Sequence, residues 1–155
     1  MTMKIRGFEI VSDKFRKFPN VDVKLPQRGT SQAMAYDFYS NETITIMPGE
    51  QYMFVTDIKA YMQPGEALIG NVRSSQGVKK HLSFANSQAW IDMDYYSNPD
   101  NDGNIGICLY NYGTKAQTIE VGERIAQFSF IPFLVADNGN TNVQREGGFG
   151  STGTK

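Results

Sequence analysis

Short apolar stretches rich in β-branched and aromatic residues recur along the chain, and each predicts a β-strand. They occupy residues 43–47, 52–58, 67–72, 105–110 and 124–133. Turn signals such as Pro48-Gly49, Pro64-Gly65 and Val121-Gly122 lie between them. These turns are spaced too closely for long intervening helices. The pattern therefore predicts an all-β protein.

A short helix fits only one segment, residues 74–82, and Gly77 weakens helix formation there. Many short strands with tight turns favour a sandwich or a β-barrel of jelly-roll type. This architecture hosts many unrelated functions. Function must therefore be argued from particular sites.

The alternation of strands and turns stops near residue 135. Residues 136–144 are rich in Asn, Gly and Thr and have no apolar face, which predicts a flexible linker. After it, Arg145 and Phe149 stand among glycines. We expect a β-barrel domain over residues 1–135, then a linker and a glycine-rich C-terminal lid over residues 136–155. On composition alone, a disordered end is the commoner interpretation of such a tail.

Composition narrows the function classes. A chain of 155 residues with 40% hydrophobic residues forms one domain with a packed core, and its single Cys108 has no partner for an internal disulfide. Fifteen basic and sixteen acidic residues leave no broad cationic stripe, so polymeric nucleic acid is not an expected partner. No apolar run approaches the roughly 18 residues of a membrane span. We expect a cytoplasmic protein, or one in the host cytoplasm if a virus encodes it, with no membrane partner.

The tail carries groups suited to a nucleotide. Glycines let backbone N–H groups approach phosphate oxygens, and Ser151 and Thr152 add hydroxyl donors. Arg145 adds a charged fork, and Phe149 could stack on a base.

Two carboxylates follow the apolar segment at residues 89–91. Alternation as in a strand would bury Ile91 and Met93 and turn Asp92 and Asp94 to the other face, near Tyr95. Carboxylates placed together serve water activation or metal binding. The alternative is that they begin a solvated hairpin.

Two further segments could bind anions or metal. Arg73, Ser74 and Ser75 end a predicted strand where a helix could start, which suits a phosphate, although ordinary N-capping by either serine is as good an explanation. Asp37 could reach Mg²⁺ through the water shell that this ion usually retains. A strand-end aspartate is an equally plausible interpretation.

Taken in order, these segments resemble the five motifs of the trimeric dUTP diphosphatases (dUTPases) over about residues 33–153. The matching segments are Ala33-Met-Ala-Tyr-Asp37, Arg73-Ser-Ser75, Asn86 through Tyr95, Gly122-Glu-Arg-Ile-Ala-Gln127 and Arg145-Glu-Gly-Gly-Phe-Gly-Ser-Thr-Gly153. The last is the most specific of the five.

The resemblance implies a jelly-roll homotrimer with three active sites at subunit interfaces, each covered by the tail of a neighbouring chain. The reaction would be Mg²⁺-assisted hydrolysis of dUTP to dUMP and diphosphate by attack of water at the α-phosphorus. It would limit uracil in DNA and supply dUMP for thymidylate synthesis. Asp92 would activate the water, and Tyr95 would pack under the deoxyribose and exclude a 2′-hydroxyl.

The resemblance also assigns the other site residues. Around the uracil it places Asn86, Ala89, Trp90, Ile91 and, as a cover, Phe149. Along the substrate it places Arg73, Ser74, Ser75, Gln127, Arg145, Gly150, Ser151 and Thr152. Asp37 would hold Mg²⁺ indirectly, through a water.

Some features depart from the family pattern. Ala35 and Ala89 stand where glycine is usual, Val72 stands where proline is common, and residues 97–104 look like a surface insertion. A dCTP deaminase has the same fold, but it would use a glutamate base and would not need this tail. A regulatory protein that keeps the nucleotide site as a sensor is a further alternative, and residues 97–104 are the candidate contact for its partner. A purely structural trimer gives no reason for the motifs to coincide.

Overall fold

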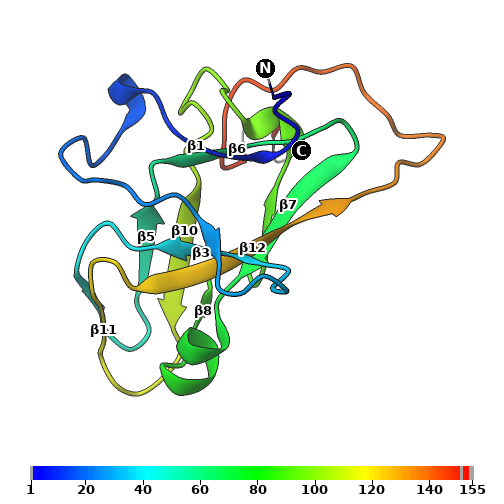
Figure 1. The fold of residues 1–155 in the computed structure, drawn as a ribbon. Helices are drawn as coiled ribbons and strands as arrows, with labels where there is room; N and C mark the ends of the chain where they lie inside the picture. The colour runs from blue at the N-terminus through cyan, green and yellow to red at the C-terminus, as the bar shows by residue number, and fades with distance from the viewer. Residues whose placement is uncertain (1, 151, 154–155) are drawn as a thin grey trace.

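A computed structural model describes residues 2–150 and 152–153 of the protein (Figure 1). The strands are β1 (Gly7–Ile10), β2 (Gln27–Arg28), β3 (Tyr36–Tyr39), β4 (Ile44–Ile46), β5 (Gln51–Val55), β6 (Ile58–Tyr61), β7 (Glu66–Asn71), β8 (Leu82–Phe84), β9 (Ala89–Ile91), β10 (Gly106–Asn111), β11 (Gln117–Ile119) and β12 (Arg124–Pro132). The short helical turns are η1 (Asp13–Phe15), η2 (Ser75–Lys79) and η3 (Met93–Tyr95).

The strands form antiparallel sheets around one interior. The largest sheet has the order β2-β3-β12-β7-β9, and a second has the order β5-β10-β8. Two further pairs, β1 with β6 and β11 with β4, complete the barrel (Figure 1). The predicted all-β, jelly-roll-like fold is thereby confirmed.

Aromatic side chains from neighbouring strands fill the interior. The ring of Phe38 on β3 lies 4.7 Å from that of Phe128 on β12. Gly70 on β7 pairs with Phe128 across the ladder, and a Cβ on Gly70 would lie only 2.4 Å from the Phe128 ring. Glycine therefore lets β7 lie flat against this ring, directly before the segment that carries Arg73.

The predicted strands agree with the structure except over residues 52–58. There β5 ends at Val55 and β6 begins at Ile58, so one predicted strand is two. Between them Asp57 has a φ of 58°, and its buried carboxylate accepts hydrogen bonds from the backbone N–H groups of Lys17 and Phe18. At Asp57 the chain passes from the sheet that contains β5 to the pair that contains β6. The pattern of apolar positions in the sequence does not indicate a contact between residues so far apart.

The segment predicted as a short helix, residues 74–82, contains only the π-helical turn η2, after which β8 begins at Leu82. Ser74 precedes the turn, but its side chain does not cap it. The N-capping interpretation of Ser74 is therefore wrong.

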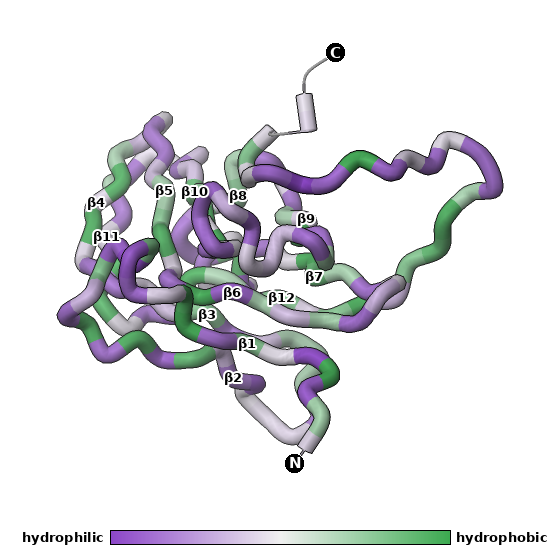
Figure 2. The backbone as a smooth tube through the Cα atoms, turned by 90° about the horizontal axis from the view of Figure 1, so that it is seen from above, coloured by the Kyte–Doolittle hydropathy of each residue, from purple (hydrophilic) through white to green (hydrophobic). Residues whose placement is uncertain are grey.

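After β12 the described chain has no further strand or helix. The exposed segment of residues 136–144 loops away from the barrel and then returns toward it, as the tube in Figure 2 shows. The division into a domain over residues 1–135 and a lid over residues 136–155 stays a prediction.

Candidate active site

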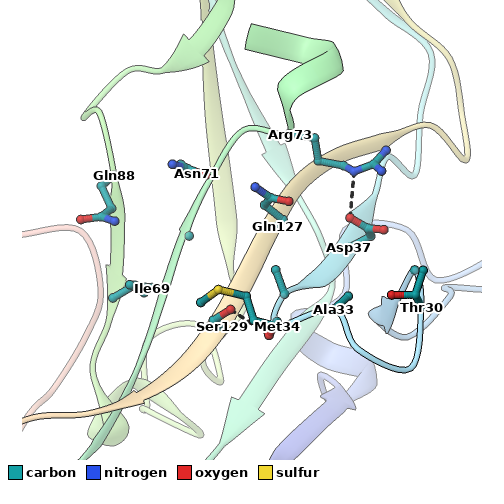
Figure 3. Close-up of a pocket in the computed structure, with 13 residues that line it drawn as sticks. Thr30, Ala33, Met34, Asp37, Ile69, Asn71, Arg73, Gln88, Gln127 and Ser129 are labelled. Atoms are coloured by element: carbon teal, nitrogen blue, oxygen red, sulfur yellow. Dashed lines mark hydrogen bonds and ion pairs between the residues drawn. The ribbon is translucent and has the colours of Figure 1, made fainter. Parts of the chain in front are cut away.

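Most of the expected site residues fall into two separate cavities on one chain. The first cavity has a volume of about 470 Å³, and Asp37, Arg73 and Gln127 are among its lining residues (Figure 3). The second has a volume of about 460 Å³. Its lining includes Asn86, Ala89, Trp90, Ile91, Asp92, Tyr95, Arg145, Phe149, Gly150 and Thr152. The two cavities share no lining residue, so each holds only part of the expected site.

The floor of the first cavity is built from three adjacent strands. Gln127 on β12 pairs in register with Asp37 on β3 and with Asn71 on β7. Arg73 follows two residues after Asn71, where β7 has ended. The order of the strands therefore brings three chain segments together in one polar patch.

Asp37 is buried, and its carboxylate is paired with two arginine side chains. Its Oδ1 lies 2.9 Å from Arg73 Nε, and its Oδ2 lies 3.7 Å from Arg124 Nη1. Figure 3 shows the Asp37 and Arg73 side chains pointing toward each other across the cavity. Because a carboxylate within this distance fixes a guanidinium group, Asp37 orients Arg73 and leaves part of its fork available to an anion.

The second cavity contains the expected base. Asp92 and Asp94 are both exposed and both accept from Arg145: Arg145 Nη2 lies 2.5 Å from Asp92 Oδ2, and Arg145 Nε lies 2.7 Å from Asp94 Oδ1. The prediction that the two carboxylates share a face is consistent with this contact. The prediction that Met93 is buried is wrong, because β9 ends at Ile91 and η3 leaves Met93 36% exposed.

Tyr95 is held by the loop that follows it. Its hydroxyl donates to the Asn104 backbone carbonyl at 2.7 Å and accepts from Asn101 Nδ2 at 2.8 Å. Burial raises the pKa of Tyr95, and the Asn101 hydrogen bond opposes this only in part. The phenol is therefore a fixed, neutral group at physiological pH.

The interpretation of residues 97–104 as a surface insertion is wrong for much of the loop. Asn98, Asp102 and Asn104 are buried there. Asp102 accepts from Ser12 N and from Lys59 Nζ, and Asn104 Nδ2 donates to Asp57 Oδ1. The loop packs into the barrel and supports Tyr95, since its Asn and Asp side chains bind backbone groups and neighbouring side chains.

The tail lies over the second cavity of its own chain. A Cβ on Gly148 would come within 2.8 Å of the Tyr95 ring, and a Cβ on Gly106 within 2.9 Å of Phe149. The expectation that a tail covers only a neighbouring chain's site differs from this arrangement. In the single chain, Arg145 pairs with the Asp92 that precedes it by 53 residues.

Two expected residues, Ser74 and Ser75, line neither of these cavities. Ser75 lines a shallow cavity of about 450 Å³ beside Arg73, with Lys80 and Arg124. Ser74 directly precedes η2 and lines neither this cavity nor the first. Ser151 lies outside the described residues.

Sequence reasoning missed Asn101 as a support of Tyr95 and Arg124 as a partner of Asp37. The sequence carried one usable signal, the Asn98-Pro99-Asp100 turn with further Asn and Asp residues after it, because such side chains order a loop through local hydrogen bonds. No local signal indicated the contact between Arg124 and Asp37.

Two classes of feature are absent from the described part of the chain. No three His, Cys, Asp or Glu side chains are grouped there so that they could hold a metal ion. Nor does that part contain a helix with the length and apolar character needed to cross a membrane.

Comparison with known proteins gives a consistent result. The dUTPase family model matches residues 21–153. A deoxyuridine 5'-triphosphate nucleotidohydrolase of Lactococcus lactis subsp. lactis is 46% identical over 154 residues, which covers 97% of this chain and 99% of that protein. The protein of the same name from Escherichia phage T5 is 34% identical over 144 residues, with 84% and 93% of the two chains covered.

Solved structures agree in fold. The dUTPase of Streptococcus mutans has a TM-score of 0.74 at 39% identity, with 85% of this chain and 99% of that chain covered. A mutant dUTPase from phage phi11 of S. aureus, described for its coordination of a structural Mg(II) ion, has a TM-score of 0.70 at 19% identity, with 90% and 98% covered. The second likeness shows the fold alone. The family match and the nearly full-length relatives together show that this chain belongs to the dUTPase family.

Proposed function

We propose that the protein hydrolyses dUTP to dUMP and diphosphate at a site shared between chains of a homotrimer. The observation that carries this is the division of the site residues between two cavities. The cavity with Asp92 and Tyr95 would face the cavity with Arg73 and Gln127 of another chain. A rotationally symmetric oligomer repeats such a pairing at each interface and leaves no half-site unused.

The cavity around Asp92 supplies the base and the sugar pocket. A water oxygen bonds to the α-phosphorus while its proton passes to the Asp92 carboxylate, and the bond to the oxygen that bridges the α- and β-phosphorus atoms breaks. Diphosphate leaves with that bonding pair. The Tyr95 ring, which the 97–104 loop holds in place, packs under the deoxyribose and leaves no space for a 2′-hydroxyl.

The same cavity would recognise the uracil of the substrate. The segment from Asn86 to Ile91 lies along it, and Phe149 enters it from the tail. The backbone of this segment would bind the uracil edge, and the Phe149 ring would cover the uracil face. Enclosure of the substrate by the tail excludes competing water from the reacting phosphate.

The triphosphate would lie along the first cavity. Arg73, fixed by Asp37, and Gln127 offer donors there, and Ser74 and Ser75 follow Arg73 in the chain. The tail residues Arg145, Gly150, Ser151 and Thr152 would meet the phosphates from the other side. Phosphoryl transfer depends mainly on such positioning and on neutralisation of charge.

Mg²⁺ fits this arrangement as an ion held largely by the substrate. The first cavity contributes one buried carboxylate, that of Asp37, and Mg²⁺ commonly binds through one carboxylate, substrate phosphates and waters. Asp37 would hold the ion through a water. When bound, the metal would withdraw electron density from the phosphates and neutralise their charge.

The direct test is diphosphate release from dUTP, dCTP, dTTP and UTP in the presence of Mg²⁺. We expect strong preference for dUTP, and equal hydrolysis of all four would refute the assigned specificity. Asp92→Asn should retain dUTP binding and lose at least the roughly 10²-fold in turnover that a general base supplies. Release of ammonia from dCTP would indicate a deaminase instead.

A further inference from the structure

Asn138 and Gly139 form the one Asn-Gly pair in the sequence. The pair lies in the linker, residues 136–144, which loops away from the barrel (Figure 2). Every residue of the linker is exposed, and none belongs to a strand or a helix. The proposed reaction assigns Asn138 no task. The chemistry of this pair is therefore a separate question from the chemistry of the active site.

The pair places an electrophilic carbon beside an unhindered nitrogen. The backbone nitrogen of Gly139 can attack the side-chain carbonyl carbon of Asn138, because the two atoms are close enough along the chain to close a succinimide ring. A side chain on the following residue crowds this approach, and glycine has none. Asn140, in the same linker, precedes Thr141, whose β-branched side chain is bulky and stiff. The sequence therefore favours ring closure at Asn138.

The structure leaves both reacting groups free. Among the described residues, neither the Asn138 side chain nor the Gly139 N–H has a hydrogen-bonding partner. Asn140 Nδ2, by contrast, donates to the Ala136 carbonyl at 2.9 Å, and this bond closes a turn around the pair. Gly139 has a φ of 81°, and a Cβ there would meet nothing within 4 Å. No packing thus prevents the Asn138 side chain from approaching the next nitrogen.

The Asp102-Gly103 pair is the protected counterpart in the same chain. Both residues are buried. The Asp102 carboxylate accepts from Ser12 N at 2.8 Å and from Lys59 Nζ, and Gly103 N donates to Asn101 Oδ1 at 3.0 Å. Both groups that would have to react are therefore held by other partners. The difference between the two pairs comes from their tertiary contacts.

We propose that Asn138 is a site of spontaneous deamidation. The Gly139 nitrogen loses its proton and bonds to Asn138 Cγ, and the Cγ–Nδ2 bond breaks as the side-chain nitrogen takes up a proton and leaves as ammonia. A water then opens the succinimide at one of its two carbonyls. Opening at Cγ gives an aspartyl residue, and opening at the main-chain carbonyl gives an isoaspartyl residue. The net reaction consumes one water and releases one ammonia.

Both products change the linker. Each adds a carboxylate beside Asp137 and changes the formal net charge of the chain from −1 to −2. The isoaspartyl product also adds one methylene to the backbone that connects β12 to Arg145. The whole fifth motif lies beyond this point, so the modification changes the segment on which the motif is tethered. This inference goes beyond the proposed function and does not depend on dUTP as the substrate.

Peptide mapping after incubation of the folded protein tests the proposal. Trypsin releases residues 125–145, which contain Asn138, Asn140 and Asn142, and tandem mass spectrometry locates a change among them. We expect the mass gain that exchange of NH₂ for OH produces, at Asn138 and ahead of the other two. It should grow with time and accelerate from neutral to mildly alkaline buffer, since hydroxide removes the Gly139 amide proton. Enzymatic methylation of isoaspartyl carboxyl groups should label the same peptide.

Two variants serve as matched controls. Gly139→Ala should lose most of the conversion, because its methyl group crowds the attacking nitrogen. Asn138→Gln keeps an amide at the same place but would have to close a larger ring, so it should stay unmodified over the same incubation. Digestion in heavy-oxygen water marks any conversion that occurs during the digest. The peptide of residues 81–115, which contains Asp102 and Gly103, should show no isoaspartyl product while the protein is folded.

Two results would overturn the proposal. Asn138 could stay unmodified in the folded protein while the chain unfolded in guanidinium chloride is converted, which would show that the folded linker protects the pair. Equal conversion of Asn138 and Asn140 would remove the role of Gly139. Neither readout uses hydrolysis of dUTP, so a failure of the proposed function would be seen separately, in the assay of diphosphate release.

Discussion

Replacement of Tyr95 by phenylalanine separates the task of the ring from that of the hydroxyl. Tyr95 is 7% exposed and lines the cavity that contains Asp92. The hydroxyl points away into the 97–104 loop, where it donates to Asn104 O and accepts from Asn101 Nδ2. We therefore expect Tyr95→Phe to reduce stability and to preserve the preference for dUTP over UTP.

The magnitude follows from the two hydrogen bonds. A buried neutral hydrogen bond contributes about 1 kcal/mol net, so the loss of both should cost about 2 kcal/mol of unfolding free energy. Because the raised pKa keeps the phenol protonated, this cost should not vary between roughly pH 6 and 9. The ring that would contact the sugar is unchanged, so kcat/KM for dUTP relative to UTP should stay within about threefold.

Urea unfolding, at a fixed concentration of chains, measures the first quantity, and initial rates with the two nucleotides measure the second. Tyr96→Phe is the matched control, because its hydroxyl donates to Glu9 Oε2 at 2.7 Å at a half-buried position. It should cost about 1 kcal/mol or less. Unchanged stability in Tyr95→Phe, or a loss of sugar discrimination beyond about tenfold, would refute this division of tasks.

Three further predictions concern the barrel, the loop and the tail. Gly70→Ala should destabilise the protein by about 1 to 3 kcal/mol in urea unfolding, since its methyl group would meet the Phe128 ring. Burial alone would raise the pKa of Asp102, but hydrogen bonds from Ser12 N–H and Lys59 lower it overall. The ionised Asp102 carboxylate therefore stabilises the fold above the unfolded-state pKa of about 3.9, and this stabilisation is lost as the pH falls below that value. Asp102→Asn should therefore cost about 2 kcal/mol at pH 7, and the difference from wild type should narrow between about pH 5 and 3. Mixed trimers of Asp92→Asn and Arg145→Ala chains should recover no dUTP hydrolysis if a tail acts on its own chain's Asp92, and recovery would show that it acts on a neighbour's.

Local pattern predicted much of the fold. Alternating apolar positions and Pro-Gly or Gly turns located β4, β7, β10 and β12, because strand period and turn conformation are properties of neighbouring residues. The same reasoning expected Asp92 and Asp94 on one face of a strand, but β9 ends at Ile91 and the two carboxylates meet Arg145 at the helical turn η3. It failed at residues 52–58, where the buried Asp57 binds backbone groups 39 and 40 residues away and breaks the strand.

The site was harder to predict because its contacts are remote in sequence. The 97–104 loop resembled a surface insertion, since its polar composition does not show that Asn98, Asp102 and Asn104 are buried among backbone groups. The resemblance supplied a list of residues but not their division between two cavities. The division depends on the order of the strands in the sheets, which the motifs do not contain. A site shared between two chains would explain the division.

Complementation in mixed trimers tests the shared site most directly. Arg73→Ala chains and Asp92→Asn chains should each be nearly inactive, because each lacks one half of every site. Trimers formed from equal amounts of both should recover about a quarter of wild-type dUTP hydrolysis, since Arg73 and Asp92 of one site would come from different chains in a symmetric oligomer. No recovery, with mixed trimers demonstrated by differently tagged chains, would show that Arg73 and Asp92 of one chain act together and would contradict the account.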